Sequence, residues 1–327
     1  MPNRADVRPV LSPSAPSAPL PPATKRGFAV LRAYLALTKT RIIEQLLVVT
    51  VPAMFLAERR AGGGSIPSVW LLVATLLGGA VAAASAHALN CVVDADIDAK
   101  MKRTQGRPLA TDQVPRSHAL VFGLVLGVIS AVWLGLTTNW LAAALAVAAI
   151  AFYVLVYTLL LKRRTAQNIV WGGAAGCMPV VIGWAAVTGR VDWPALVMFG
   201  VIFFWTPPHF WALAMRYRDD YAAAGVPMLP VVAEPVAVSR RIVAYSWTMA
   251  LWSLLLLPVT SWVYGAVAVI CGAWFVVMAH RLHAAVRAGQ PARPMRLFHL
   301  SNTYLCVLFI TVALDAAFGL PVLTWPF

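Results

Sequence analysis

Nine long apolar runs are the feature that most constrains how this chain can fold. An apolar helix of ~20 residues crosses the hydrocarbon core of a bilayer. The chain is also 61% hydrophobic and only 12% charged, whereas a soluble domain carries roughly 25% charged residues. These properties exclude an ordinary soluble, disordered or coiled-coil protein. They predict an all-α, polytopic, multi-pass protein of the cell membrane with nine transmembrane helices. The runs cover residues 41–57, 69–90, 118–137, 140–161, 168–188, 194–215, 242–260, 263–284 and 299–319.

The basic residues between these runs predict the orientation of the chain. Lys and Arg number 26 against 12 Asp and Glu, and cytoplasmic loops are enriched in Lys and Arg. With nine spans, almost all of the basic residues fall on one side, and only Arg59, Arg60 and Arg190 fall on the other. We therefore expect a cytoplasmic N-terminus and a C-terminus outside. The net charge of +14 then reflects membrane topology, and no nucleic-acid partner is expected.

The N-terminal segment differs in composition from the rest of the chain. Residues 1–33 are rich in proline and alanine and lack helical periodicity. Such a segment cannot bury enough apolar surface to offset the entropy lost on ordering. We expect residues 1–33 to form a disordered cytoplasmic tail and residues 34–327 to form one nine-helix intramembrane domain.

An acidic cluster follows the second apolar run. Asn90, Asp94 and Asp98 recur at every fourth residue, so they lie within about 80° of one another on one helix face. Asp96 points away from that face. Like charges at this spacing repel each other, and a hard divalent cation such as Mg²⁺ would compensate them. The alternative interpretation is a solvated acidic helix end that pairs with the lysines after it.

Basic side chains accompany this cluster. Arg103 and Arg107 follow it directly, and arginine binds phosphate oxygens in a bidentate manner. Lys162 and Arg163 lie in the fourth connection, which is expected on the same side of the membrane. Carboxylates, Mg²⁺ and cations together are typical of a diphosphate site.

Two further features are expected near this side of the membrane. A second acidic pair, Asp219 and Asp220, lies in the sixth connection beside Arg216 and Arg218. Two acidic clusters facing one cavity could hold one or two metal ions on a diphosphate. His209 follows a double proline inside the apolar run 194–215. The prolines are expected to break the helix there, and an intramembrane histidine indicates a cavity.

Three blocks of residues resemble one known family. Together they are similar to the UbiA superfamily of intramembrane aromatic prenyltransferases, and within it to the branch whose acceptor is haem. The resemblance covers about residues 35–320. In the second acidic cluster Tyr217 and Tyr221 stand at the spacing where the superfamily usually has two aspartates, and Asp220 is the expected ligand between them. The blocks comprise Asn90, Asp94, Asp96, Asp98, Lys100, Met101, Arg103, Thr104, Arg107 and Pro108; Tyr157, Thr158, Lys162, Arg163, Thr165, Gly172, Gly176, Pro179, Ile182 and Gly183; and Pro208, His209, Asp220, Tyr221 and residues 227–230.

The resemblance implies a fold, a reaction and a set of site residues. It implies nine helices of the UbiA type and transfer of a farnesyl group from farnesyl diphosphate to a vinyl group of haem b. Water then quenches the resulting cation and leaves a hydroxyl group. The implied partners are farnesyl diphosphate, haem b, the lipid bilayer, and haem A synthase or oxidase assembly proteins. Combined with the residues themselves, the resemblance leads to these expectations. The catalytic residues are Asn90, Asp94, Asp98 and Asp220, and the Mg²⁺ ligands are these four and Asp219. Arg103, Arg107, Lys162 and Arg163 bind the diphosphate. By hypothesis, His209, Arg216 and Arg218 bind the haem.

Two other functions remain open at this point. One is a UbiA-type enzyme with a different aromatic acceptor such as 4-hydroxybenzoate, against which the Pro-Pro-His segment argues. The other is a cation-coupled transporter that uses the acidic cluster as its ion site. Transporters place such sites near the bilayer midplane at broken helices, whereas here the acids lie at a helix end beside arginines. That position favours a metal-bound anionic substrate.

Overall fold

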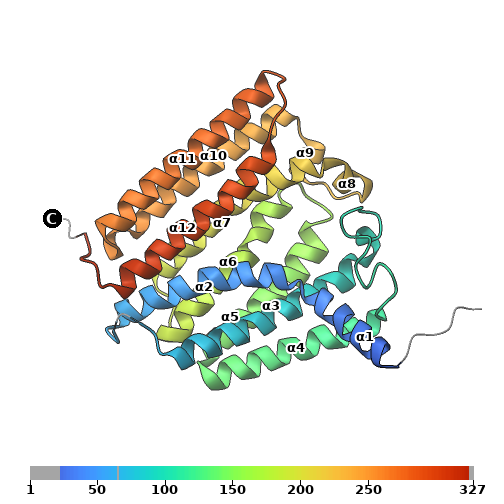
Figure 1. Ribbon diagram of the computed structural model, residues 1–327, viewed down its shortest axis with the longest axis horizontal. Helices are drawn as coiled ribbons and strands as arrows, with labels where there is room; N and C mark the ends of the chain where they lie inside the picture. Colours follow the sequence, from blue (N-terminus) through green and yellow to red (C-terminus); the bar gives the residue numbers. More distant parts are fainter. Residues whose placement is uncertain (1–22, 65, 324–327) are drawn as a thin grey trace, which may run out of the picture.

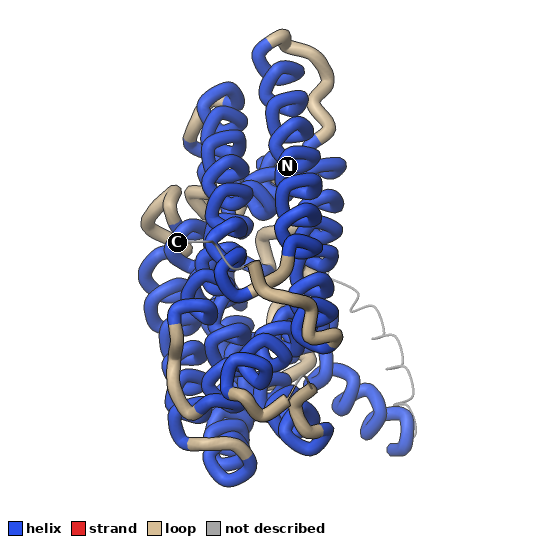
Figure 2. Tube along the Cα trace, turned by 90° about the vertical axis from the view of Figure 1, so that its left-hand side faces the viewer, coloured by secondary structure: helices blue, strands red, loops and turns tan. Residues whose placement is uncertain are grey.

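The structure is a computed structural model that describes residues 23–64 and 66–323. Those residues form helices and the connections between them, with no strand among them (Figure 2). The helices are α1 (Ala23–Thr38), α2 (Thr40–Ala61), α3 (Val69–Asp98), α4 (Arg116–Thr137), α5 (Trp140–Ala151), the π-helix η1 (Phe152–Leu161), α6 (Asn168–Thr188), α7 (Trp193–Arg216), α8 (Arg218–Ala223), α9 (Leu229–Val232), α10 (Pro235–Ser253), the 3₁₀-helix η2 (Leu254–Val259), α11 (Trp262–Arg287) and α12 (Pro294–Ala317).

The expected membrane architecture is confirmed. Within the described residues, eight spans are long and apolar enough to cross a bilayer. The segments 28–38 and 42–61, in α1 and α2, form a ninth candidate with a bend of 50° between them. The apolar runs of the sequence each correspond to one of these helices. The side of the membrane on which each terminus lies stays a prediction.

Two expectations differ from the observed helices. The helix α1 begins at Ala23, so residues 23–33 are helical although we expected them in the disordered tail. Residues 1–22 of that tail lie outside the described residues. The double proline does not break α7, which continues from Trp193 to Arg216. Proline removes a backbone donor, but Pro207 and Pro208 are buried among neighbouring helices, and this packing stabilises the helix.

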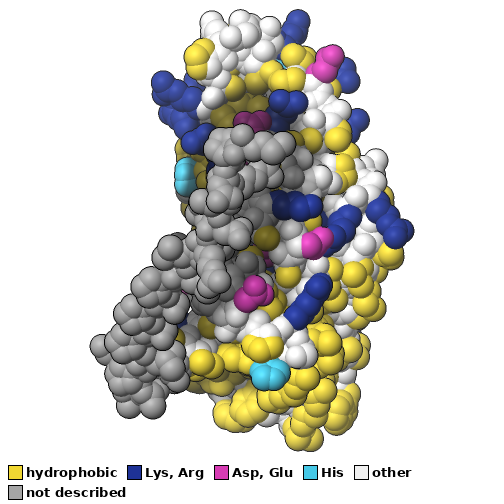
Figure 3. All heavy atoms as spheres, turned by 90° about the vertical axis from the view of Figure 1, so that its right-hand side faces the viewer, with side chains coloured by type: hydrophobic (Ala, Val, Ile, Leu, Met, Phe, Trp, Pro, Cys, Tyr) yellow, Lys and Arg dark blue, Asp and Glu magenta, His cyan; other side chains and the backbone are white. Residues whose placement is uncertain are grey.

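Both polar segments that we expected to form a site lie at one end of the molecule. Figure 1 shows the connection 99–115 and α8 at the same end of the helix assembly, with the end of α12 at the opposite end. Lys and Arg side chains gather on this end among a few acidic ones, above a hydrophobic surface (Figure 3). An apolar cluster that includes Ile97, Met101, Ala214 and Tyr221 packs the end of α3 against α7 and α8. This packing brings the two acidic clusters together.

The π-helix η1 shapes the wall of the site. Lys162 N donates a hydrogen bond to Tyr157 O (2.8 Å). This five-residue spacing is rare in proteins, but where it occurs it is often at a functional site. The ring of Tyr157 lies directly against Gly172 of α6, where a Cβ atom would overlap it. The wider helix and the missing side chain together let the tyrosine face the interior.

Candidate active site

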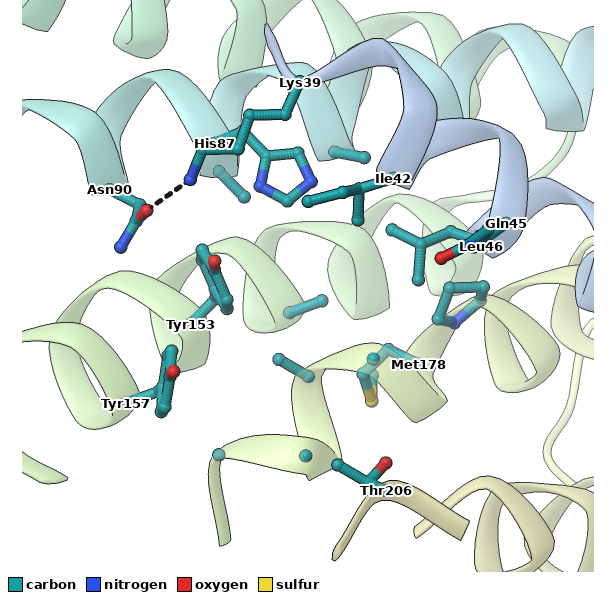
Figure 4. A pocket seen from close by; sticks show the side chains of 18 of the residues that line it. Lys39, Ile42, Gln45, Leu46, His87, Asn90, Tyr153, Tyr157, Met178 and Thr206 are labelled. Atoms are coloured by element: carbon teal, nitrogen blue, oxygen red, sulfur yellow. Dashed lines mark hydrogen bonds between the residues drawn. The ribbon is translucent and has the colours of Figure 1, made fainter. Parts of the chain in front are cut away.

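A cavity of about 340 Å³ opens between α2, α3, α5, η1, α6 and α7. Along α3 its lining changes from mostly small residues to polar ones: Thr75, Gly79, Ala82, Ala83 and Ala86 come first, and His87, Asn90 and Asp98 come last. The neighbouring segments continue this division, with mostly apolar side chains beside the small residues of α3 and cations beside its polar end. Figure 4 shows one of these cations, Lys39, beside Asn90. The cavity therefore has an apolar channel and a polar head. The channel is completed by Ile42, Leu46, Ile150, Met178 and Ile182, and the head by Lys39, Arg103, Arg107 and Lys162.

The predicted polar face of α3 points into the protein. Asn90, Asp94 and Asp98 are all buried, with exposed fractions of 2%, 0% and 3%. Asn90 Nδ2 donates to Asp94 Oδ2 (2.7 Å) and to Thr158 Oγ1 (3.1 Å). Asp96 is exposed on the other face of the helix. Asn90, Asp94 and Asp98 thus form one row of polar side chains inside the protein, which we call the polar ladder.

Cations from other segments pair with this ladder. Arg107 Nη1 contacts both carboxylate oxygens of Asp98, at 2.6 and 2.8 Å, and Lys162 Nζ contacts Asp94 Oδ2. Lys39 Nζ donates to Asn90 Oδ1 (2.7 Å). Burial alone would lower the pKa of Arg107, but the charge and hydrogen bonds of Asp98 raise it overall. Each buried carboxylate therefore has a cation beside it, and the guanidinium of Arg107 stays charged.

Arg163 lies apart from this interior set. Its guanidinium binds both carboxylate oxygens of Asp96, at 2.6 and 2.7 Å. The hydrogen bond to Asp96 raises the pKa of Arg163. Its Nη2 atom is 4.0 Å from Asp94 Oδ1. The predicted diphosphate ligand is thus a partner of the outward-facing aspartate at the margin of the site.

The second acidic cluster meets the first through backbone and side chains. Asp220 Oδ2 accepts a hydrogen bond from the Arg103 backbone N–H (3.4 Å), and the Arg103 guanidinium lies 5.9 Å from the centre of the Tyr217 ring. Tyr221 is buried and lines the cavity, and this burial raises the pKa of its phenol. The two clusters therefore occupy one region of the protein, as the sequence predicts.

Three residues of this second cluster are not placed in the cavity. Asp219, Arg216 and Arg218 are exposed, and Arg218 Nε donates to Pro230 O (2.9 Å). Arg216 is the last residue of α7, and Arg218 and Asp219 begin the short helix α8. All three side chains point outward, a direction that residue type alone does not reveal. In the described part of the chain, no group of three or more His, Cys, Asp or Glu side chains is arranged to hold a metal ion.

The polar ladder nevertheless fits a hard cation. Asp94 Oδ1 is buried and has no hydrogen-bond partner among the described residues. Asn90, Asp94 and Asp98 offer side-chain oxygen atoms, which Mg²⁺ prefers. Mg²⁺ in such sites is held by one or two carboxylates together with substrate phosphates.

His209 is held rigidly at the cavity wall. Its ring stacks between Trp205 and Phe298, at centroid distances of 4.1 and 4.3 Å. Its Nδ1 atom lies 2.7 Å from Ser301 Oγ. The histidine is buried yet lines the cavity. One ring nitrogen is therefore fixed by the protein, and the other has no hydrogen-bond partner among the described residues.

Several cavity residues were missed by the analysis of the sequence. We assigned Lys39 to membrane topology, although it binds Asn90 and has left-handed backbone angles (φ 53°, ψ 53°). Tyr153 lies inside an apolar run and showed no signal of its own, whereas Tyr157 belongs to the second block of the family resemblance. Only the π-helix directs these rings toward the cavity (Figure 4).

Comparison with known proteins identifies the family. A model of the UbiA prenyltransferase family matches residues 46–303. The chain belongs to the UbiA prenyltransferase family. This UbiA prenyltransferase is 64% identical over 314 residues to protoheme IX farnesyltransferase 2 of Saccharopolyspora erythraea, which covers 96% of this chain and 95% of the relative. It is 62% identical over 291 residues to the protoheme IX farnesyltransferase of Mycolicibacterium smegmatis, which covers 89% and 93%.

Solved structures confirm the UbiA-type fold. A digeranylgeranylglyceryl phosphate synthase superposes with a TM-score of 0.71 at 14% identity, covering 88% of this chain and 99% of that one. A UbiA homologue from Archaeoglobus fulgidus, bound to GPP and Mg²⁺, superposes with a TM-score of 0.63 at 14% identity, covering 87% and 99%. Membership of a prenyltransferase family removes the basis for the transporter alternative.

Proposed function

We propose that this UbiA prenyltransferase transfers the farnesyl group of farnesyl diphosphate to a vinyl group of haem b, which gives haem O. One observation carries the proposal: a single cavity joins a cationic, oxygen-rich head to an apolar channel and a buried histidine. The high identity to relatives named protoheme IX farnesyltransferase, over almost the whole chain, supports the choice of haem as acceptor.

The polar head would bind the diphosphate. Arg103, Arg107 and Lys162 line it, and guanidinium and ammonium groups bind phosphate oxygens strongly. Mg²⁺ held by Asn90, Asp94 and Asp98 would neutralise charge that develops on the leaving diphosphate. When the substrate enters, Arg107 and Lys162 would turn from their carboxylates toward the phosphate oxygens. Fixed cations of this kind lower the free energy of the charged transition state.

The other predicted site residues are given supporting roles according to where they lie. Asp220 orients the backbone at Arg103 and would extend the metal site. Arg163, bound to Asp96, would hold the end of α3 in place at the margin of the diphosphate site. Arg216 and Arg218 are exposed, and they remain proposed partners of the haem propionates.

The channel and the histidine would position the two organic groups. The small residues along α3 leave room for the farnesyl chain, and the surrounding apolar side chains exclude water from the allylic cation. His209 would contact the haem from the wall of the cavity, because its Nδ1 atom is fixed by Ser301 and its other nitrogen is left over. A histidine fixed in this way is typical of metal-binding imidazoles.

The proposal is tested by the product. Purified full-length protein is incubated in detergent with farnesyl diphosphate, haem b and Mg²⁺, and the haem fraction is analysed by mass spectrometry. We expect a farnesylated haem whose formation stops when the metal is chelated. Asp94→Asn should abolish the product, whereas the matched change Asp112→Asn should not, because Asp112 is exposed and left-handed (φ 54°). Prenylation of 4-hydroxybenzoate without prenylation of haem would overturn the choice of acceptor.

A further inference from the structure

His87 marks the junction between the apolar channel and the polar head. It follows the small cavity-lining residues of α3 and precedes Asn90 by three positions, which is about 4.5 Å along the helix axis. The side chain is 6% exposed and lines the cavity. Figure 4 shows its ring between Lys39, Ile42 and Tyr153, and it meets the Tyr153 ring edge-on at 5.8 Å.

Both ring nitrogens of His87 are buried and have no hydrogen-bond partner among the described residues. A buried polar group without a partner is destabilising, so such a group in a native protein calls for a reason. Because the ring faces the cavity, its missing partner is expected to come from the contents of the cavity. A water molecule or a substrate atom can provide it.

The two cavity histidines differ in what they are free to do. His209 is stacked between two aromatic rings and bonded to Ser301, so its position and one of its nitrogens are fixed. His87 has one edge-on aromatic neighbour and two unbonded nitrogens. A fixed imidazole suits the orientation of a large acceptor, whereas a free one suits proton transfer.

The proposed reaction requires a proton acceptor at this junction. The C–O bond of the allylic diphosphate breaks and its electron pair leaves with the diphosphate. The vinyl π electrons form the new C–C bond to the first farnesyl carbon, and the positive charge moves to the vinyl carbon attached to the porphyrin. The oxygen of a water molecule adds to that carbon, and one proton must then leave. With the diphosphate in the head and the chain in the channel, these atoms meet beside His87.

The other side chains around this point are poor acceptors. Lys39, Lys162 and the two arginines of the head are hydrogen-bond donors without an acceptor atom. Asp98 is bound to Arg107 through both of its oxygens, and Asp94 is a ligand of the metal in the proposed function. Tyr153, Tyr157 and Tyr221 are phenols, which release a proton at high pH and do not take one up. A neutral imidazole can accept a proton at its unprotonated ring nitrogen, and both ring nitrogens of His87 are without a partner among the described residues.

We propose that His87 is the proton acceptor for the water that adds to the farnesylated haem cation. The inference rests on the proposed function, since it assigns one step of that reaction to one residue. His87 binds the water through one ring nitrogen, directs its oxygen at the cationic carbon and takes its proton as the new C–O bond forms. The released diphosphate is the competing acceptor.

The test separates this step from the earlier loss of diphosphate. Three variants are compared with the parent: His87→Leu, His87→Gln, and the control His118→Leu, since His118 lies exposed on α4. Diphosphate release and the hydroxylated haem product are measured in the same reaction. General base catalysis contributes about 100-fold or more. We therefore expect His87→Leu and His87→Gln to lower hydroxylated product about 100-fold, diphosphate release to fall much less, and the control to match the parent.

A chemical rescue distinguishes proton transfer from a packing role. His87→Ala leaves a space in the cavity wall, and added imidazole should restore hydroxylated product in this variant and leave His87→Leu unchanged. Parent-like amounts of hydroxylated haem from His87→Leu would overturn the inference and assign the proton to the diphosphate. Equal losses of diphosphate and haem product, with no rescue, would also overturn it. A parent protein that forms no farnesylated haem would instead refute the proposed function.

Discussion

Removal of the Arg107 side chain tests how far the buried aspartates depend on the protein's own cations. The Asp98 side chain is 4% exposed and Arg107 is its ion-pair partner, at 2.6 Å. Arg107→Met leaves a carboxylate buried without a partner, which costs about 3–5 kcal/mol. Because the Arg107 side chain is 25% exposed, water can enter in its place. The expected loss in free energy of unfolding is therefore near the lower limit, about 3 kcal/mol.

A double-mutant cycle isolates the pair. Asp98→Asn removes the buried charge and leaves a cation that water can reach, so it should cost only about 1 kcal/mol. The double variant should recover most of the stability lost in Arg107→Met, because neither charge remains. Unfolding is followed by denaturant titration in detergent micelles, with and without Mg²⁺. The metal should stabilise Arg107→Met more than the parent, since it neutralises the unpaired carboxylate.

Two results would refute this reasoning. Parent-like stability of Arg107→Met would show that Asp98 is not a buried charge in the folded protein. A double variant no more stable than Arg107→Met would show that the arginine acts through packing of its stem and not through its charge. Either result would also remove the electrostatic basis for placing a cation on the polar face of α3.

Three further variants address separate parts of the cavity. Lys39→Met removes the ammonium that binds Asn90 and should raise the KM for farnesyl diphosphate roughly tenfold, since a charged hydrogen bond contributes about 1.5–3 kcal/mol; an unchanged KM in steady-state kinetics would exclude Lys39 from the head. Gly172→Ala places a methyl group against the Tyr157 ring and should lower the free energy of unfolding by about 1–3 kcal/mol. An unchanged midpoint in thermal unfolding would contradict this prediction. His209→Phe should raise the KM for haem while diphosphate release without haem stays constant, and equal changes in both would assign His209 to folding.

The parts of the site that the sequence could predict are those fixed by local geometry. The spacing of Asn90, Asp94 and Asp98 determines that they share a helix face, and the same rule turns Asp96 away. The structure shows this division, with Asp94 buried and Asp96 exposed and bound to Arg163. The length of the apolar runs likewise predicted the spans, because each span must satisfy its backbone within one helix.

The parts that could not be predicted depend on tertiary packing. The run 140–161 has the composition of one ordinary helix, yet its second half is π-helical and turns Tyr153 inward. The direction of α8 places Arg218 on Pro230, although its neighbours in the sequence suggested the cavity. The prolines of α7 break a helix in isolation, but here neighbouring helices enclose them. No local pattern carries information on these contacts.

The pairing of charges in the head has a consequence for how the enzyme would take up its substrate. Asp94 and Asp98 each hold a cation from another segment, Lys162 from the end of η1 and Arg107 from the connection 99–115. A metal-bound diphosphate brings both signs of charge, so it can replace each pair by two new ones: metal with carboxylate, and phosphate with ammonium or guanidinium. Either component alone leaves one set of side chains without a partner. We therefore expect Mg²⁺ and farnesyl diphosphate to bind cooperatively, each raising the affinity of the other by the same factor, and calorimetric titrations that show independent binding would contradict this exchange of partners.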